Sequence, residues 1–217
     1  MNSRRNVLVT GASKGIGAAV ALAFARNGDN VCVNFNGDRE GAETTVAACC
    51  TLGVEAIAVA ADVSDRTQVQ VLFETCEARL GPVRCLVNNA GVIGGHMPID
   101  KLSTEALRTC FSVNVFGSFF TLSEAAQRMP DHGGGSVVNM SSVAAELGSP
   151  GEYVHYAASK GAIETLTVGA GKELAAKGIR VNAIRVGTTA TDIHAREGNP
   201  DRPKQVAKVT PLGRVAQ

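Results

Sequence analysis

The sequence predicts one α/β domain built on a doubly wound parallel sheet, with a layer of helices on each face. Short apolar runs alternate with helical segments along the chain, and six of the runs are strand-like. The runs show no period-two polar face, which is typical of strands buried on both sides. The 217 residues suit a single domain, and we find no linker, internal repeat or low-complexity segment. We therefore expect one three-layer domain spanning residues 1–217.

The amino-acid composition limits the kinds of ligand that the protein is expected to bind. The net charge of +1 gives no electrostatic reason to expect nucleic acid or an anionic membrane as a ligand. No apolar run is long enough to span a bilayer, and the N-terminus enters a strand without a signal-peptide core. The six cysteines lack CxxC spacing, which favours free thiols over disulfides or a metal site. We expect a cytoplasmic protein that binds no metal, nucleic acid or membrane.

The elements follow one another in a regular order. Strands are expected at residues 6–10, 30–35, 54–60, 85–87, 136–140 and 179–185. Helices are expected at residues 18–27, 40–52, 67–80, 102–129 and 153–177. Glycine follows several of these helices, as helix C-termini commonly require. Residues 186–202 have the composition of a loop.

A glycine-rich turn joins the first strand to the first helix. It runs Gly11-Ala12-Ser13-Lys14-Gly15-Ile16-Gly17. Glycine lets the backbone turn tightly and approach a pyrophosphate, and the helix N-terminus offers free N–H groups. The spacing differs from both the common GxGxxG fingerprint and the P-loop. An ordinary tight turn is the alternative, but the flanking strand and helix favour a dinucleotide site.

The end of the second strand bears on the choice of cofactor. In NAD-binding units an acid commonly ends this strand and binds the adenosine ribose hydroxyls. Here the chain runs Asn34-Phe35-Asn36-Gly37-Asp38-Arg39, with no acid at the strand tip. Lys14 and Arg39 can both meet a 2′-phosphate, although both can also be solvated surface charges. We expect NADP(H) to be preferred, with NAD(H) possible.

Polar residues also follow the later strands. Asp62-Val63 ends the third, where Asp62 can accept from an adenine amino group or cap the next helix. Asn88-Asn89-Ala90-Gly91 ends the fourth, where it can fix the turn or face a ligand. Asn114 lies in an apolar helical stretch and must find partners, as a core amide or as a water-binding residue.

Tyr156 and Lys160 are four residues apart in an expected helix, so they share one face of it. An ammonium beside a phenol favours the phenolate, and we therefore expect the pKa of Tyr156 to be lowered towards neutral pH. Such a group can act as a general acid/base on an alcohol or ketone. Ser142, at the end of the fifth strand, can polarise the same carbonyl.

Taken together, these motifs resemble the short-chain dehydrogenase/reductase family, which has the Rossmann fold. The matching positions are Thr10-Gly11-x-x-x-Gly15-x-Gly17, Asp62, Asn88-Asn89-Ala90-Gly91, Asn114, Ser142 and Tyr156-x-x-x-Lys160. They occur in the family's order over essentially the whole chain. Within the family the chain is loosely similar to bacterial glucose-dehydrogenase-like and acyl-carrier-protein-reductase-like members.

The resemblance implies an NAD(P)(H)-dependent oxidoreductase that interconverts a secondary alcohol and a ketone. Its implied catalytic residues are Asn114, Ser142, Tyr156 and Lys160, with Ser141 and Tyr153 as competitors for the serine and tyrosine roles. Tyr156 would transfer the proton, Ser142 would orient the substrate oxygen, Lys160 would hold the ribose and lower the tyrosine pKa, and Asn114 would hold a water.

The implied cofactor contacts extend over the whole strand-end edge of the sheet. They are Gly11, Ser13, Lys14, Gly15, Ile16, Gly17, Asn34, Arg39, Asp62, Val63, Asn88, Ala90, Gly91, Tyr156, Lys160, Val186, Gly187, Thr188 and Thr191. The substrate would be a small carbonyl compound or alcohol, with pocket residues from 94–98, 144–152 and 188–201. A non-catalytic dinucleotide-binding protein of the same fold is the alternative.

The chain also departs from the family pattern. Val186-Gly187 stands where the family usually has Pro-Gly, so a looser loop is expected there. Family members usually continue into another helix and a seventh strand, whereas six strands are expected here. Either the sequence is incomplete or the domain lacks an edge strand, and in the second case the edge of the sixth strand would be exposed. The family pairs into oligomers, so a homo-oligomer, dimer or tetramer, is expected.

Overall fold

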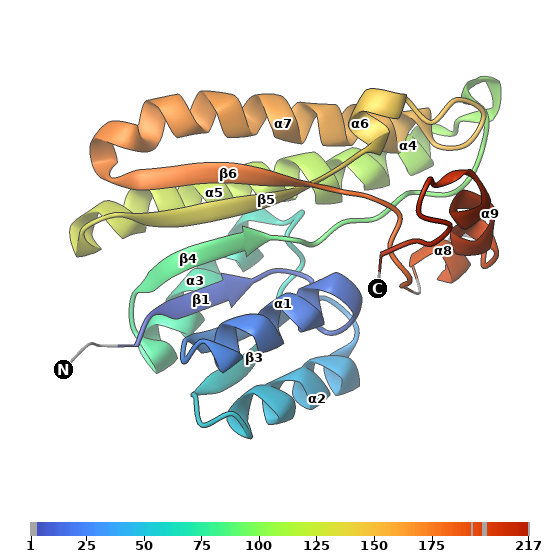
Figure 1. Ribbon diagram of the computed structural model, residues 1–217. Helices are drawn as coiled ribbons and strands as arrows, with labels where there is room; N and C mark the ends of the chain where they lie inside the picture. Colours follow the sequence, from blue (N-terminus) through green and yellow to red (C-terminus); the bar gives the residue numbers. More distant parts are fainter. Residues whose placement is uncertain (1–3, 192, 197–198, 217) are drawn as a thin grey trace.

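The computed structural model describes residues 4–191, 193–196 and 199–216. Its centre is a six-stranded sheet in the order β3-β2-β1-β4-β5-β6, in which every pairing is parallel (Figure 1). The strands are β1 (Asn6–Val9), β2 (Asn30–Phe35), β3 (Ala56–Ala60), β4 (Val83–Asn88), β5 (Gly135–Ser142) and β6 (Ile179–Val186). The chain winds outward from β1 to β3 and then returns to add β4 on the other side of β1. This confirms the doubly wound Rossmann fold.

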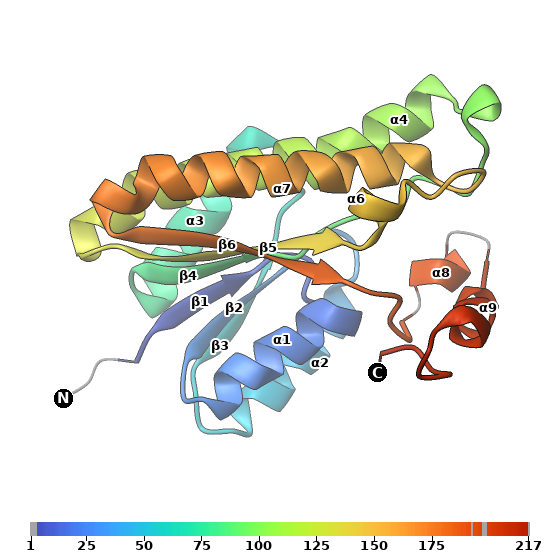
Figure 2. The same cartoon turned by 45° about the horizontal axis from the view of Figure 1, so that its top comes forward.

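Helices cover both faces of the sheet (Figure 2). On one face lie α1 (Gly15–Arg26) and α2 (Arg39–Cys50). The other face carries α3 (Arg66–Leu80), α4 (Thr104–Phe111), α5 (Gly117–Arg128) and α7 (Val154–Leu174). Both faces of the central strands are therefore protected from water, as their continuous apolar sequences predicted.

The core lies in two layers, one on each side of the sheet. Val7 and Val9 of β1 pack with the α1 and α2 side, whereas Leu8, between them, packs with Leu72 and Phe73 of α3. All five side chains are fully buried. Successive strand residues point to opposite faces, so β1 links the two layers and fixes its own register. Burying such a side chain contributes about 1.5–3 kcal/mol.

The helix expected at 102–129 contains a break in its regular hydrogen bonding. The chain runs from α4 through a π-helical turn, η2 (Ser112–Phe116), into α5, and Asn114 lies inside that turn. Ser118 donates a hydrogen bond to the Asn114 carbonyl at 2.8 Å. Single π turns occur often at functional sites, and this one directs the Asn114 side chain inward.

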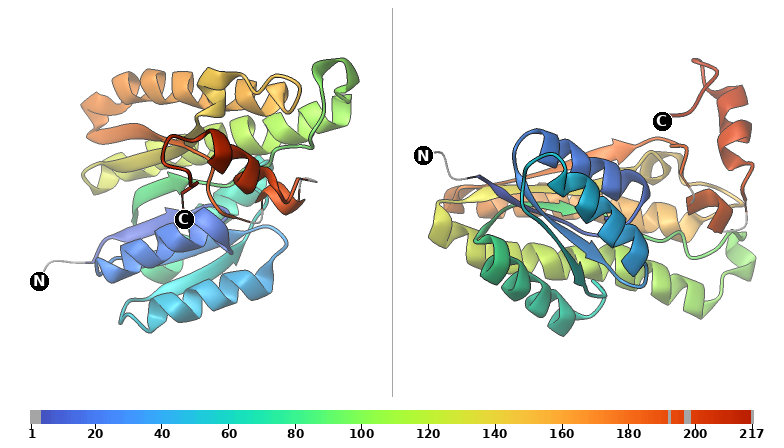
Figure 3. Two further views of the ribbon diagram at one scale, coloured as in Figure 1. Left: turned by 45° about the vertical axis from the view of Figure 1, so that its right-hand side comes forward. Right: turned by 90° about the horizontal axis from the view of Figure 1, so that it is seen from below.

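Short helices that the sequence pattern did not predict follow β5 and β6. These are α6 (Ala144–Leu147), α8 (Ile193–Arg196) and α9 (Arg202–Val209). Of the single turns, η1 (Ile99–Lys101) was not predicted, whereas η3 (Met129–His132) and η4 (Ala175–Lys177) lie at the ends of the expected helices. Figure 3 shows α8, α9 and the C-terminal residues gathered beyond one end of the sheet. Thr189 forms a parallel bridge with Ala216, which holds the end of the described chain against the residues that follow β6.

β6 is an edge strand of the described sheet, as expected. Ile184 in this strand is 53% exposed. Within the described residues no helix is both long and apolar enough to cross a membrane.

Candidate active site

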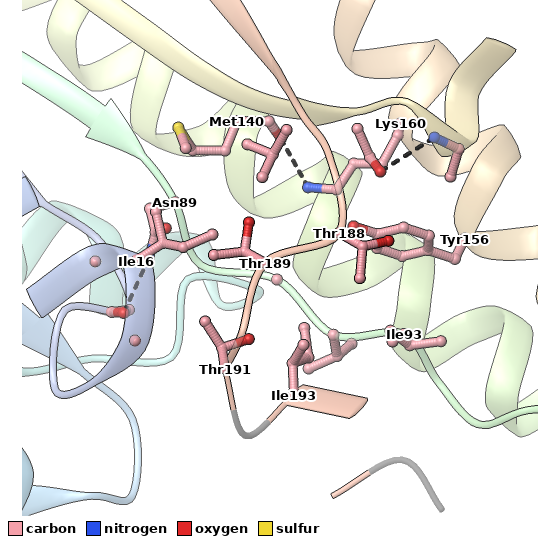
Figure 4. A pocket seen from close by; sticks show the side chains of 18 of the residues that line it. Ile16, Asn89, Ile93, Met140, Tyr156, Lys160, Thr188, Thr189, Thr191 and Ile193 are labelled. Atoms are coloured by element: carbon pink, nitrogen blue, oxygen red, sulfur yellow. Dashed lines mark hydrogen bonds between the residues drawn. The ribbon is translucent and has the colours of Figure 1, made fainter. Parts of the chain in front are cut away.

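A cavity of about 1130 Å³ lies beyond the carboxyl ends of the strands. It extends from the glycine-rich turn after β1 to α9, and Figure 4 shows part of its wall. Eighteen of the residues expected at the site line it: Gly11, Ser13, Lys14, Gly15, Ile16, Gly17, Asn34, Asp62, Val63, Ala90, Gly91, Ser142, Tyr156, Lys160, Val186, Gly187, Thr188 and Thr191. Arg39, Asn88 and Asn114 are outside this lining.

The glycine-rich turn has no room for side chains at two positions. Gly11 has φ +60°, and a Cβ there would lie 2.8 Å from the Cα of Ala90. A Cβ on Gly17 would lie 2.4 Å from the Gly11 carbonyl oxygen. The Asn89 amide donates to the carbonyls of Thr10 and Gly11 at 2.9 and 3.0 Å. The two glycine-bearing segments after β1 and β4 are therefore locked together.

This turn fits a dinucleotide. Lys14 occupies the N-cap of α1, and its side chain makes no cap hydrogen bond. The first N–H groups of α1 are thus available beside the cavity, where a pyrophosphate would gain from both the donors and the helix dipole.

The part of the cavity beside the end of β2 contains the ion pair of Lys14 and Asp38. The Lys14 ammonium lies 2.9 Å from the Asp38 carboxylate, and this interaction is the main cause of a lowered pKa of Asp38. The Arg39 guanidinium lies over the Phe35 ring at 5.5 Å and near Glu43. Lys14 therefore borders the cavity, whereas Arg39 packs outside it.

Asn34 and Asp62 both have structural partners at this end. The Asn34 amide donates to the Ala61 carbonyl at 3.0 Å, and its oxygen accepts from the Gly11 N–H at 3.3 Å. Asp62 accepts from both the N–H and the hydroxyl of Ser64. The N-cap of α3 is Asp65, so Asp62 fixes the turn before that helix rather than capping it. Both Asn34 and Asp62 still border the cavity.

Tyr156 and Lys160 lie on one face of α7, but their electrostatics differ from the expectation. The Lys160 ammonium donates to the Met140 carbonyl at 2.7 Å and lies 5.6 Å from the centre of the Tyr156 ring (Figure 4). Burial raises the pKa of Tyr156 to about 12 and lowers that of Lys160 to about 8. The predicted lowering of the tyrosine pKa is therefore wrong for this arrangement, because desolvation of the phenol outweighs the hydrogen bond from Ser142.

The two candidate serines at the end of β5 face different partners. The Ser141 hydroxyl is buried and donates to Glu164 at 2.8 Å. A hydrogen bond from the Ser142 hydroxyl to the Tyr156 phenol acts to lower the tyrosine pKa. The geometry thus favours Ser142 over Ser141 beside Tyr156.

Asn114 is a fully partnered core amide. Its oxygen accepts from the Val92 N–H at 2.8 Å, and its nitrogen donates to the Val92 carbonyl and the Ser159 hydroxyl. Ser159 in turn donates to the Tyr156 carbonyl at 2.7 Å. Asn114 therefore ties the loop after β4 to the first turn of α7, and its water-binding role stays a prediction.

Asn88 is also satisfied within the core. It donates to Asn139 at 2.9 Å and accepts from the Thr121 hydroxyl at 2.6 Å. Both contacts fit the structural role that the sequence left open for Asn88.

Comparisons with known proteins agree with this geometry. The family model described as short chain dehydrogenase matches residues 5–201. The chain belongs to this family. It is 44% identical to the uncharacterized oxidoreductase YgfF of Escherichia coli (strain K12), over 97% of this chain and 86% of that protein. It is 32% identical to the 3-oxoacyl-[acyl-carrier-protein] reductase FabG of Staphylococcus aureus, over 100% of this chain and 87% of that protein.

The solved structure of an NAD⁺-bound xylitol dehydrogenase superposes with a TM-score of 0.89 and 29% identity, covering 100% of this chain and 88% of that one. Membership in the short-chain dehydrogenase family makes the protein an oxidoreductase with an NAD(P) site.

Sequence reasoning missed much of the substrate end of the cavity. The residues that it missed are Arg202, Val206 and Val209 of α9, whereas Leu147 lies in the expected range 144–152 and Tyr153 was the expected competitor for the tyrosine role. The expected contribution of residues 94–98 is absent from the lining, where Ile93 takes part instead. The spacing of Val206 and Val209, one helical turn apart, was the available signal for α9.

A metal centre has no support within the described residues, where no cluster of three or more His, Cys, Asp or Glu side chains could hold an ion.

Proposed function

We propose that this short-chain dehydrogenase interconverts a secondary alcohol and a ketone, with Tyr156 as the general acid/base and NADP(H) as the preferred cofactor. The observation that carries the proposal is the joint placement of Ser142, Tyr156 and Lys160 on the wall of one cavity that also contains the glycine-rich turn. A nicotinamide cofactor, when bound, would supply or accept the hydride.

The chain's own residues account for substrate orientation and proton transfer. The Ser142 and Tyr156 hydroxyls adjoin one another and can both donate to a carbonyl oxygen. Tyr156 gives its proton to that oxygen in reduction and removes it in oxidation. Lys160 keeps a buried positive charge beside Tyr156, which favours the phenolate when the proton leaves.

The NADP preference rests on Lys14 rather than on Arg39. Lys14 borders the cavity next to residues that follow β2, and its ammonium can pair with a 2′-phosphate. Asp38 competes for the same ammonium, so the preference is moderate and NAD(H) remains a usable cofactor. The xylitol dehydrogenase, whose structure contains NAD⁺, is consistent with that second use.

Replacing Tyr156 by Phe tests the mechanism. We expect turnover of a carbonyl panel to be abolished, while NADPH binding, followed by nicotinamide fluorescence, and the melting temperature are kept. If Tyr153 were the acid, Tyr153→Phe would abolish turnover instead. Unchanged turnover in Tyr156→Phe would remove Tyr156 from the mechanism. Cofactor binding by a wild-type protein without turnover of any carbonyl or alcohol would favour the non-catalytic alternative.

We also propose that the protein works as a homo-oligomer, a dimer or tetramer. Leu107, Phe116, Phe119 and Val168 are 39–57% exposed on α4, η2, α5 and α7, which lie side by side in Figures 1 and 2. Exposed apolar side chains on neighbouring helices support a contact with a second copy. Light scattering of wild type and of Phe119→Asp tests this, since a monomeric wild type would contradict it.

A cytoplasmic location is proposed as well. Five of the six cysteines are buried and none forms a disulfide, which is usual in a reducing compartment. Fractionation of the source cells with an antibody to the protein would test it.

A further inference from the structure

We propose that Arg202 binds a carboxylate carried by the substrate, at a position several bonds away from the reacting carbonyl. This inference rests on the proposed function, because it names the substrate class of the same site. Arg202 is the first residue of α9 and lines the cavity together with Ser142 and Tyr156.

Arg202 is connected to the reacting centre through one aromatic ring. Its guanidinium lies over the Tyr153 ring, 5.7 Å from the ring centre. The Tyr153 ring in turn packs edge-on against Tyr156, with 5.7 Å between the ring centres. A ligand whose carbonyl oxygen meets Tyr156 must therefore extend past Tyr153 to reach Arg202. A straight spacer of a few carbons satisfies this requirement, and an α-oxo acid does not.

The guanidinium has donors left over. It donates to Glu152 and to the Tyr153 hydroxyl, whereas its Nε is buried and has no hydrogen-bond partner among the described residues. A buried N–H without a partner is destabilising by about 1–3 kcal/mol, so an additional oxygen acceptor is favoured here. The planar guanidinium matches the two oxygens of a carboxylate.

Glu152 marks the place where such a carboxylate binds. It is itself a carboxylate, only 24% exposed, and it is paired with Arg202 before substrate arrives. The His96 imidazole lies 3.9 Å from the same Glu152 oxygen. Glu152 therefore has a second polar neighbour on the same side when Arg202 turns to the substrate. Val206, one turn further along α9 from Arg202, lines the same cavity.

The alternative is a purely structural ion pair that holds α9 in place. In that case, loss of Arg202 would weaken binding of charged and neutral substrates equally. The two interpretations therefore predict different preferences between charged and neutral substrates when Arg202 is replaced, whereas a change in stability would not separate them.

The test compares 4-oxopentanoate with its methyl ester in wild type, Arg202→Gln, Arg202→Lys and Glu152→Gln. Lys204→Gln is the matched control, because Lys204 lies on the same helix, is 82% exposed and pairs with Asp201. We expect wild type to prefer the acid in kcat/KM, and Arg202→Gln to lose about 10- to 100-fold on the acid but little on the ester. Arg202→Lys should recover part of the preference, and Glu152→Gln should increase it.

Binding without turnover provides a second measurement. Calorimetry with pentanoate and pentanamide should show tighter binding of pentanoate to wild type and loss of that difference in Arg202→Gln. Equal binding of the two probes, or an unchanged difference in Arg202→Gln, would overturn the proposal. If no carbonyl compound is turned over, the proposed function fails while this binding result still decides the role of Arg202. If Arg202→Gln does not fold, Glu152→Gln and Arg202→Lys decide it, since a structural pair predicts no gain in acid preference.

Discussion

Replacing Lys14 by Ala should weaken NADPH binding while leaving NADH binding nearly unchanged. Lys14 borders the cavity beside the residues that follow β2, and the 2′-phosphate is the group that distinguishes the two cofactors. A charge-assisted hydrogen bond contributes about 1.5–3 kcal/mol when it is protected from water. The Lys14 side chain is 43% exposed, so we reduce this to about 1–2 kcal/mol. The dissociation constant for NADPH should therefore rise about 5- to 30-fold.

Asp38→Asn should have the opposite effect. Asp38 holds the Lys14 ammonium at 2.9 Å and adds a negative charge beside the phosphate position. It also accepts from the Gly41 N–H at the start of α2, a cap that asparagine can replace. We expect NADPH to bind about two- to fivefold more tightly in this variant, with α2 intact.

Fluorescence titration of NADPH and NADH against wild type, Lys14→Ala, Asp38→Asn and Arg39→Ala measures these effects. Arg26→Ala, at the far end of α1, controls for the loss of one positive charge. The NADPH preference should also decrease with added salt, since both charges are accessible to ions. An equal loss of NADPH and NADH affinity in Lys14→Ala, or a larger loss in Arg39→Ala, would refute the reasoning.

Three further changes follow from contacts at the site. Gly17→Ala places a Cβ 2.4 Å from the Gly11 carbonyl oxygen, so cofactor binding and melting temperature should both fall. Asn114→Ala leaves the Val92 N–H and carbonyl without their partner, which should lower the free energy of unfolding by about 2–4 kcal/mol in urea denaturation and slow turnover. Burial lowers the pKa of Lys160 from its ordinary value of 10.5 to about 8 in the folded chain. Between these two pH values the unfolded state therefore binds more protons than the folded state. Its contribution to stability should therefore rise with pH across that window, and Lys160→Met should lose the rise when unfolding is compared at pH values of about 7.5 and 9.5.

Much of the fold and of the cofactor side could be predicted from the sequence because local patterns determine them. The apolar run of β2 was placed at its observed ends, and the glycines at 11 and 17 occupy positions where backbone atoms leave no room for a side chain. The strand run and the contact between Gly17 and Gly11 involve few residues and short separations along the chain, whereas the space at Gly11 is limited by the more distant Ala90.

The missed features depend on contacts between distant segments. The π turn at Asn114 exists because its side chain reaches the backbone of Val92, twenty-two positions away, and helical periodicity carries no sign of this. The place of Arg202 over Tyr153 likewise depends on how α9 returns to the cavity. Neither contact is encoded in a local spacing.

The protonation state of Tyr156 favours its use as an acid. The i, i+4 spacing to Lys160 predicted a phenol with a lowered pKa, but the Lys160 ammonium donates to the Met140 carbonyl and burial raises the phenol's pKa to about 12. At neutral pH the phenol therefore carries its proton, which the proposed reduction of a ketone would consume and the proposed oxidation of an alcohol would first have to remove. We expect kcat for reduction to be nearly constant between pH values of about 6 and 8, while kcat for oxidation rises about tenfold per unit. Stopped-flow measurement of both directions, with NADPH and NADP⁺ at saturation, tests this. A flat profile for oxidation would mean that the phenol loses its proton far more readily than its burial implies.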